Sequence, residues 1–167
     1  MSAREVSLHL LRHAHAGDPA RWSRPDAERP LSDKGRHQAE SMGFFLAQAG
    51  FAPDVIAASP KIRALDTARL AATPLELPVI VRDELAGGLD LRRLEELLAA
   101  LGDPGSPLLV GHDPDYSEIA AELAGVAELP LRKGTLIRID VARPLSPGAG
   151  IVRWLVPPEL IAERDPD

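Results

Sequence analysis

Arg12 and His13 stand side by side where a short apolar segment ends. That segment, residues 6–11, is too brief for a helix and is followed by Gly17, so it is typical of a strand buried on both faces. In open α/β sheets, ligands bind at the carboxyl ends of the strands. A guanidinium group pairs well with phosphate oxygens, and an imidazole nitrogen can attack phosphorus. The pair therefore predicts a site for phosphoryl chemistry.

A second histidine, His112, follows another short apolar segment, residues 108–111. Because the carboxyl ends of parallel strands meet at one edge of a sheet, we expect His112 to lie at the same edge as His13. A lone histidine is more often structural. Two histidines at equivalent strand exits favour a functional role.

Arg63 is predicted in the first turn of a helix that Ser59 opens as the N-cap and Pro60 as the first residue. A cation at this position is unfavourable against the helix dipole, and it would make more sense if it faced an anion. On the local sequence alone, an ordinary surface arginine is the favoured interpretation.

The elements that must position these residues alternate along the chain, which is typical of an α/β domain. Strands are predicted at residues 6–11, 55–58, 78–81 and 108–111. Helices are predicted at residues 33–49 after the cap Ser32, after Ser59, after the cap Asp90, and from Asp113. Alternating apolar residues over 136–141 and 151–156 predict a closing hairpin or edge strands.

Residues 14–31 form a long polar connection with three prolines, and loops of this length are usually functional or disordered. Trp22 could belong to a lid over a phosphate site, or it could simply pin the loop to the body of the protein.

The composition of the 167 residues excludes several classes of protein. A net charge of -6 argues against general nucleic-acid binding, and the lack of cysteine excludes disulfides and thiol chemistry. The amino terminus lacks the apolar stretch of a signal peptide, and no segment is apolar for long enough to span a membrane. We therefore expect a cytoplasmic protein that binds neither nucleic acid nor membrane.

Three segments together resemble the signature sequences of the histidine phosphatase superfamily. They are Leu11-Arg12-His13-Ala14, Ser59-Pro60-Lys61-Ile62-Arg63-Ala64 and Val110-Gly111-His112. The segment Pro30-Leu31-Ser32-Asp33-Lys34-Gly35 also resembles the start of a helix in this family. The Arg-His-Ala form, the short chain and the later Leu131-Arg132-Lys133-Gly134 are most similar to the SixA branch of phosphohistidine phosphatases.

The resemblance implies a phosphoglycerate mutase-like fold, which is a three-layer α/β/α sandwich with a mostly parallel central sheet, in one domain over residues 1–167. It also implies that His13 is the nucleophile, that Arg12 and Arg63 clamp the phosphate oxygens, and that His112 completes the pocket as a donor. No metal or other cofactor is implied. His13 must then be unprotonated at the attacking nitrogen, with its other nitrogen held by a partner. A backbone carbonyl near Gly17 is the partner we expect.

A general acid is harder to find in the sequence. The candidates are Glu84, after the third strand, and Asp18, in the first loop, and for Glu84 a solvated carboxylate at a turn is the favoured interpretation. An alkyl phosphate releases a strongly basic alkoxide and profits from such an acid. Phosphohistidine releases imidazole, whose conjugate acid has a pKa of about 6.5 and needs far less help.

The sequence therefore favours a metal-independent phosphatase that acts on phosphohistidine in a protein, such as a histidine phosphotransfer domain. Two alternatives stay open. One is a phosphomonoesterase for a small phosphorylated metabolite, and the other is a non-catalytic phosphate-binding or interaction module. A Rossmann nucleotide-binding domain is excluded, since no Gly-x-Gly-x-x-Gly or P-loop sequence is present.

Overall fold

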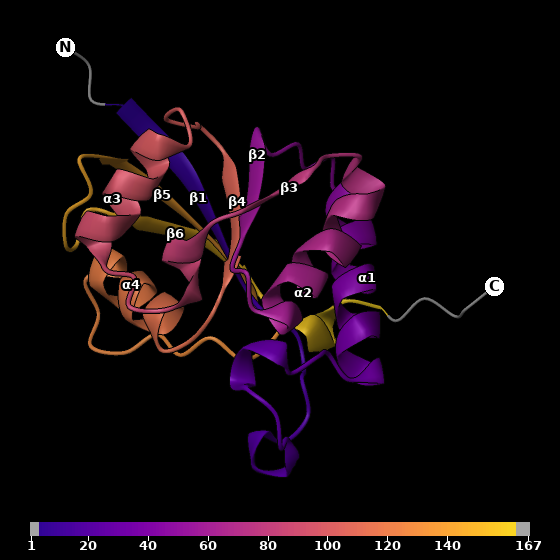
Figure 1. Cartoon of the computed structure of the whole chain (residues 1–167). Helices are drawn as coiled ribbons and strands as arrows, with labels where there is room; N and C mark the ends of the chain where they lie inside the picture. Colours follow the sequence, from indigo (N-terminus) through magenta and orange to yellow (C-terminus); the bar gives the residue numbers. More distant parts are fainter. Residues whose placement is uncertain (1–3, 163–167) are drawn as a thin grey trace.

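A six-stranded sheet lies between two layers of helices in the computed structural model, which describes residues 4–162 (Figure 1). The strands are β1 (Arg4–Arg12), β2 (Val55–Ala58), β3 (Val79–Val81), β4 (Pro107–Gly111), β5 (Leu136–Arg143) and β6 (Ile151–Val156). The helices are α1 (Asp33–Gln48), α2 (Ile62–Ala72), α3 (Leu91–Ala100) and α4 (Asp115–Ala124). This three-layer arrangement confirms the predicted fold class.

The strand order is β3-β2-β4-β1-β5-β6. The first four strands in this order are parallel, β5 pairs antiparallel with β1, and β6 pairs antiparallel with β5. The predicted closing hairpin is therefore confirmed, and of its two strands only β6 lies at an edge of the sheet. Since β1 and β4 are parallel neighbours, the residues that follow them emerge at the same edge of the sheet.

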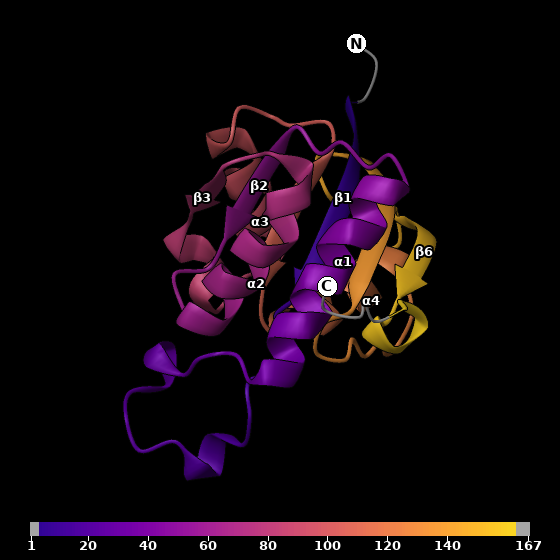
Figure 2. The same cartoon turned by 90° about the vertical axis from the view of Figure 1, so that its right-hand side faces the viewer.

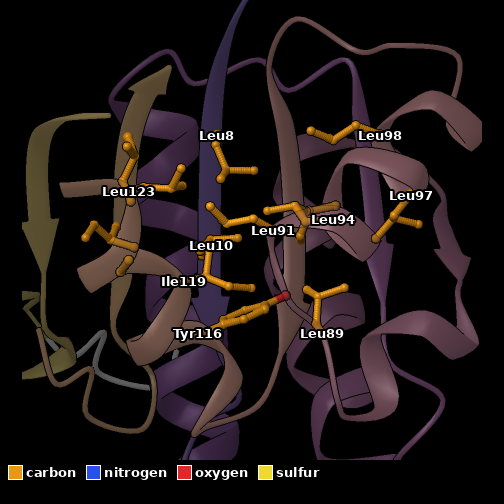
Figure 3. Packing of buried hydrophobic residues seen from close by; sticks show 14 of the residues in the cluster. Leu8, Leu10, Leu89, Leu91, Leu94, Leu97, Leu98, Tyr116, Ile119 and Leu123 are labelled. Carbon is orange, nitrogen blue, oxygen red and sulfur yellow. The ribbon is translucent and has the colours of Figure 1, made fainter. Parts of the chain in front are cut away.

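Two hydrophobic clusters fill the space on either side of the sheet. One joins α3 and α4 to β1 and β5, with Leu8 and Leu10 of β1 facing Leu94 and Ile119 (Figure 3). The other joins α1 and α2 to the opposite face, through residues such as Met42 and Leu46. Each fully buried leucine contributes about 1.5–3 kcal/mol relative to an exposed one, so the sheet is held firmly from both sides.

The predicted helix caps are confirmed at two of the helices. The Ser32 hydroxyl accepts a hydrogen bond from the N–H of Gly35 at 3.1 Å, and the Asp90 carboxylate accepts one from Arg93 at 2.8 Å.

The predicted start of α2 is wrong, because the helix begins at Ile62 and Ser59 is not its cap. The N–H of Ser59 instead donates to the carbonyl of Val110 at 3.0 Å, which extends the β2–β4 pairing beyond the end of β2. A residue held in this extended pairing cannot open a helix. Its hydroxyl accepts a hydrogen bond from the N–H of Lys61 at 3.2 Å and can still bind a second partner.

Among residues 4–162, no helix has the length and apolar character needed to cross a membrane.

Candidate active site

His13 and His112 leave the sheet from neighbouring strands. Arg12 at the end of β1 pairs with Gly111 at the end of β4, and the N–H of His13 donates to the carbonyl of Gly111 at 2.9 Å. The two imidazole rings lie with their centroids 5.3 Å apart. The parallel pairing of two strands thus brings together two histidines that are far apart in the sequence.

His13 is held in one tautomer by its own backbone. Its side chain is almost fully buried, and its Nδ1 donates to the carbonyl of Ala14 at 2.8 Å. The partner is a backbone carbonyl, as expected, but it belongs to Ala14 and not to the chain near Gly17. With the proton on Nδ1, the neutral ring keeps a free electron pair on Nε2.

The pKa of His13 is lowered to about 3, mainly by burial. The hydrogen bond to the Ala14 carbonyl opposes this shift, and the nearby cations Arg63, Arg12 and Lys133 add to it. The ring is therefore neutral at physiological pH and available as a nucleophile.

Arg12 is fixed from two sides. Its Nη1 donates to the carbonyl of Leu131 at 2.6 Å and lies 3.2 Å from a carboxylate oxygen of Asp113. Its Nε is buried and has no hydrogen-bond partner among the described residues. A buried guanidinium N–H without a partner is costly unless an anion binds there.

Arg63 faces an anion, and the interpretation as a surface arginine is wrong. Its side chain is only 7% exposed. The guanidinium donates from Nη2 to the carboxylate of Asp26 at 2.8 Å and from Nη1 to the carbonyl of the same residue at 2.8 Å. Its Nε is buried without a partner among the described residues, like that of Arg12.

The carboxylate that holds Arg63, Asp26, is bound by two guanidinium groups. Besides Arg63, the Nε of Arg29 lies 3.2 Å from the Asp26 carboxylate, and the Nη1 of Arg29 donates to the carbonyl of Ala16 at 2.6 Å. Burial alone would raise the pKa of Asp26, but the hydrogen bonds from Arg63 and Arg29 outweigh it and lower the pKa. This network ties the loop of residues 14–31, which projects beyond the sheet in Figure 2, to the start of α2.

His112 shares a hydrogen bond of 2.7 Å between its Nε2 and the hydroxyl of Ser59. Its Nδ1 is buried and has no partner among residues 4–162. The pKa of His112 is lowered to about 3, mainly by burial, and repulsion from Arg63 and from His13 when it is protonated acts in the same direction. Ser59, expected to cap a helix, instead orients this histidine.

The sequence did not single out Lys133 or Asp26 as site residues. The N–H of Gly134 donates to the carbonyl of His13 at 2.9 Å, which places Lys133 beside the site. Burial lowers the pKa of Lys133, and the neighbouring cations Arg12, Arg29 and Arg63 contribute. The family-like segment at residues 131–134 was the available signal for Lys133. Asp26 sits in an irregular loop without a motif of its own.

The two carboxylates considered as general acids are engaged elsewhere. Glu84 pairs with Arg82 at 2.6 Å, and the hydrogen bond from Arg82 lowers the pKa of Glu84. Asp18 is exposed and accepts a hydrogen bond from the N–H of Ala20 at 2.9 Å. The contacts within residues 4–162 do not bring either carboxylate to His13. Trp22 pins its own loop, since its indole N–H donates to the carbonyl of Pro25 at 3.0 Å.

In the part of the chain that the structure describes, no group of three His, Asp or Glu side chains is placed so that it could hold a metal ion. The donors that face the pocket are cationic or neutral, so the pocket suits an anion. A neutral imidazole near two guanidinium groups that each keep a buried, unpartnered N–H is an arrangement that could bind a phosphate group and take part in phosphoryl transfer.

Comparisons with known proteins agree with this class. A sequence model of the histidine phosphatase superfamily (branch 1) matches residues 8–97, more than half of the chain. An uncharacterised protein of Picosynechococcus sp. is 37% identical over 125 residues, which cover 71% of this chain and 73% of that protein. The chain belongs to the histidine phosphatase superfamily.

Three solved structures share its fold. The protein histidine phosphatase SixA complexed with tungstate has a TM-score of 0.79 at 24% identity, with 93% of this chain and 98% of that one covered. A SixA described as a putative phosphohistidine phosphatase from Nakamurella multipartitia has a TM-score of 0.73 at 25% identity, covering 93% and 96%. A putative alpha-ribazole-5'-P phosphatase from Escherichia coli has a TM-score of 0.70 at 20% identity, covering 92% and 98%. The fold is thus phosphoglycerate mutase-like, and its likeness to the SixA structures agrees with the predicted branch.

Proposed function

We propose that the protein is a metal-independent phosphatase that hydrolyses phosphohistidine in a protein through a phosphohistidine intermediate on His13. The observation that carries the proposal is the state of His13 itself. One ring nitrogen is held by the Ala14 carbonyl, and the other is free. The ring lies within electrostatic range of Arg12 and Arg63, whose Nε atoms have no partner among the described residues.

In the first step, Nε2 of His13 forms a bond to phosphorus while the bond from phosphorus to the leaving nitrogen breaks, and that nitrogen takes a proton from solvent. Arg12 and Arg63 stabilise the charge on the phosphoryl oxygens, and Lys133 adds a third cation at the rim. In the second step, the oxygen of a water molecule attacks phosphorus, the water gives up one proton, and the bond to His13 breaks. Inorganic phosphate leaves and neutral His13 is restored.

The carboxylates around the site favour a leaving group that needs little protonation. The pKa values of Asp26 and Glu84 are both lowered by bound guanidinium groups, so both carboxylates are ionised at neutral pH and neither holds a proton to donate. Alkoxide departure from an alkyl phosphate profits from such a donor, whereas imidazole departs readily without one. This supports a phosphohistidine substrate, such as a histidine phosphotransfer domain.

A phosphatase for a small phosphorylated metabolite is the second candidate, and the fold shared with the putative alpha-ribazole-5'-P phosphatase favours it. Turnover of a phosphohistidine protein and of a panel of alkyl phosphomonoesters, measured side by side with the purified chain, separates the two. We expect kcat/KM to be at least about 100-fold higher for phosphohistidine, the usual contribution of an acid that alkyl esters would lack here. Faster turnover of an alkyl ester would make the second candidate the better one.

The same assay tests the lack of a metal requirement. We expect turnover to be unchanged in EDTA, and loss of activity that a divalent ion restores would contradict the proposal.

A further inference from the structure

A second cavity, of about 430 Å³, opens on the α1/α2 face of the sheet, away from the site of His13. Its walls are the last turn of α1 with the segment after it, the middle of β1, and strands β5 and β6. Figure 2 shows why it exists: α1 covers β1, but beyond it no helix covers β5 and β6. The volume lies within the range of about 300–1,000 Å³ that is usual for small-molecule sites.

The floor of this cavity is a row of three side chains in register across the sheet. His9 of β1 pairs with Arg138 of β5, and Arg138 pairs with Trp154 of β6. Directly paired residues project from the same face, so an imidazole, a guanidinium and an indole stand next to one another. His9 also packs edge-on against Phe51, with ring centroids 4.5 Å apart, and lies 5.7 Å from the ring of Trp154. The cavity thus offers aromatic surfaces around one polar centre.

His9 is 2% exposed and takes no part in the phosphoryl chemistry. Its Nδ1 donates to the carbonyl of Pro107 at 3.2 Å, so Nε2 of the neutral ring can only accept a hydrogen bond. Burial lowers the pKa of His9 to about 4, which keeps the ring neutral. Four residues of extended chain, about 13 Å, separate it from His13. A buried imidazole is less favourable than an apolar side chain unless its polar atoms are used.

The cluster of charged residues at the edge of the cavity carries one positive charge in excess. The carboxylate of Asp140 is shared by Arg138, at 2.9 Å, and by Arg153, at 2.7 Å. Burial would raise the pKa of Asp140, but the hydrogen bonds from Arg138 and Arg153 lower it to about 2, so Asp140 carries a single negative charge between two cations. An anion bound at Arg138 would balance the remaining charge. Arg138 donates from Nε and Nη2 to the Asp140 carboxylate, at 2.9 and 3.2 Å, and from Nη2 to the hydroxyl of Ser7 at 3.1 Å. Its side chain is one-third exposed, and Nη1 is the atom left to meet such an anion.

We propose that this cavity binds a small planar aromatic acid, with its ring against Trp154 and Phe51, its carboxylate on Arg138, and a ring N–H donated to Nε2 of His9. The site is independent of the proposed phosphatase function. It gives the chain a way to bind a small metabolite on the face where the helix layer is incomplete.

Indole-3-carboxylate is a suitable probe, because it carries the ring, the acid and the N–H donor. Its binding to the 15N-labelled full chain is followed by two-dimensional NMR, in which the indole N–H of Trp154 reports directly on the cavity. We expect saturable shifts of Trp154 and of the amides around His9. The changes Trp154→Leu and Arg138→Gln should each weaken binding about tenfold, and Phe51→Leu, an apolar replacement, should weaken it measurably.

Two matched compounds and one variant make the test decisive. Cyclohexanecarboxylate lacks the aromatic ring and indole lacks the acid, so each should bind about tenfold more weakly than the probe. Arg63→Ala, which disables the phosphate pocket, should leave probe binding unchanged. The proposal is wrong if Trp154 does not respond at about 10 mM probe, which corresponds to negligible affinity. It is equally wrong if cyclohexanecarboxylate binds as well as the probe, or if Arg63→Ala abolishes binding.

Discussion

Asp26 holds the guanidinium of Arg63 by its Nη atoms and leaves Nε without a hydrogen-bond partner among the described residues. The carboxylate therefore does not act on the phosphoryl group itself; it orients a group that does. The second partner of Asp26 is Arg29, which also donates to the Ala16 carbonyl. Asp26 therefore connects two parts of the loop of residues 14–31 with Arg63 at the start of α2. Orientation of this kind has large effects, because a misplacement of about 1 Å can reduce a rate by about 100-fold.

Replacing Asp26 should therefore impair catalysis without unfolding the protein. We expect Asp26→Asn to lower kcat/KM by about 10- to 100-fold, because the neutral amide holds two guanidinium groups less firmly. Steady-state kinetics with a phosphohistidine substrate measure the effect. Asp18→Asn is the matched control in the same loop. The Asp18 carboxylate accepts a hydrogen bond from the N–H of Ala20 and acts on Lys133 more weakly than the neighbouring cations do, so the change should alter kcat/KM by less than about twofold. Equal effects of the two changes would contradict the role given to Asp26.

Glu84 is expected to be dispensable, since its carboxylate is ionised and paired with Arg82. Glu84→Gln should keep most of its activity toward phosphohistidine, within about threefold of the unchanged protein, because no proton transfer is lost. Kinetics on phosphohistidine and on an alkyl phosphate measure this. Loss of phosphohistidine turnover in a folded Glu84→Gln protein would mean that a general acid is required after all.

At the scale of elements, the first loop is seated directly against α1. A Cβ added to Gly35 would lie 1.9 Å from the carbonyl oxygen of His15, two residues after the nucleophile. The helix can approach the chain after β1 this closely only because residue 35 has no side chain. Gly35 thus sets the distance between α1 and the chain that carries Arg12 and His13.

Gly35→Ala should both destabilise the protein and reduce its activity. We expect a loss of about 1–3 kcal/mol in the free energy of unfolding, as for overpacked sites, together with lower kcat/KM as the chain after His13 shifts. Denaturant unfolding and kinetics measure the two effects. Gly105→Ala is the matched control, since the nearest atom to its added Cβ is 3.7 Å away, in ordinary contact. A Gly35→Ala protein as stable and active as Gly105→Ala would refute this reading of the contact.

Most helices and strands, and part of the site, could be predicted from the sequence. Apolar periodicity and caps predicted the strands, α1 and α3, and the strand exits placed Arg12, His13 and His112 at one edge. The burial of Arg63 against Asp26 could not be predicted from the sequence, because Asp26 lies 37 residues earlier, in a loop without hydrophobic periodicity. The prediction that Ser59 caps α2 was wrong for a related reason. A serine before a proline has the local pattern of a cap, but the hydrogen bond to Val110, which is distant in the sequence, keeps Ser59 extended.

At the scale of the whole molecule, three buried histidines link stability to pH. Burial lowers the pKa of His9 to about 4 and those of His13 and His112 to about 3, whereas the unfolded chain titrates near the ordinary value of 6.5. Between these values the unfolded state binds more protons than the folded state. Stability is therefore full above pH 6.5 and is lost as the pH falls toward 4.

We expect each histidine to remove about 2 kcal/mol from the free energy of unfolding between pH 7 and pH 5. Urea unfolding at a series of pH values measures the loss. His9→Phe should flatten the pH dependence by about one third, since one of the three groups is gone. A free energy of unfolding that does not change between pH 7 and pH 5 would contradict the burial of these groups in their neutral form.

The central claim is that His13 carries the phosphoryl group during turnover, and rapid-quench labelling tests it most directly. A substrate labelled with ³²P is mixed with the protein and quenched in alkali, which preserves phosphohistidine, and the labelled peptide is then mapped. We predict acid-labile phosphate on the peptide that contains His13 in the unchanged protein, and none on His13→Ala, which should also lose activity. Near-normal turnover by His13→Ala, or label on a different residue, would contradict the account.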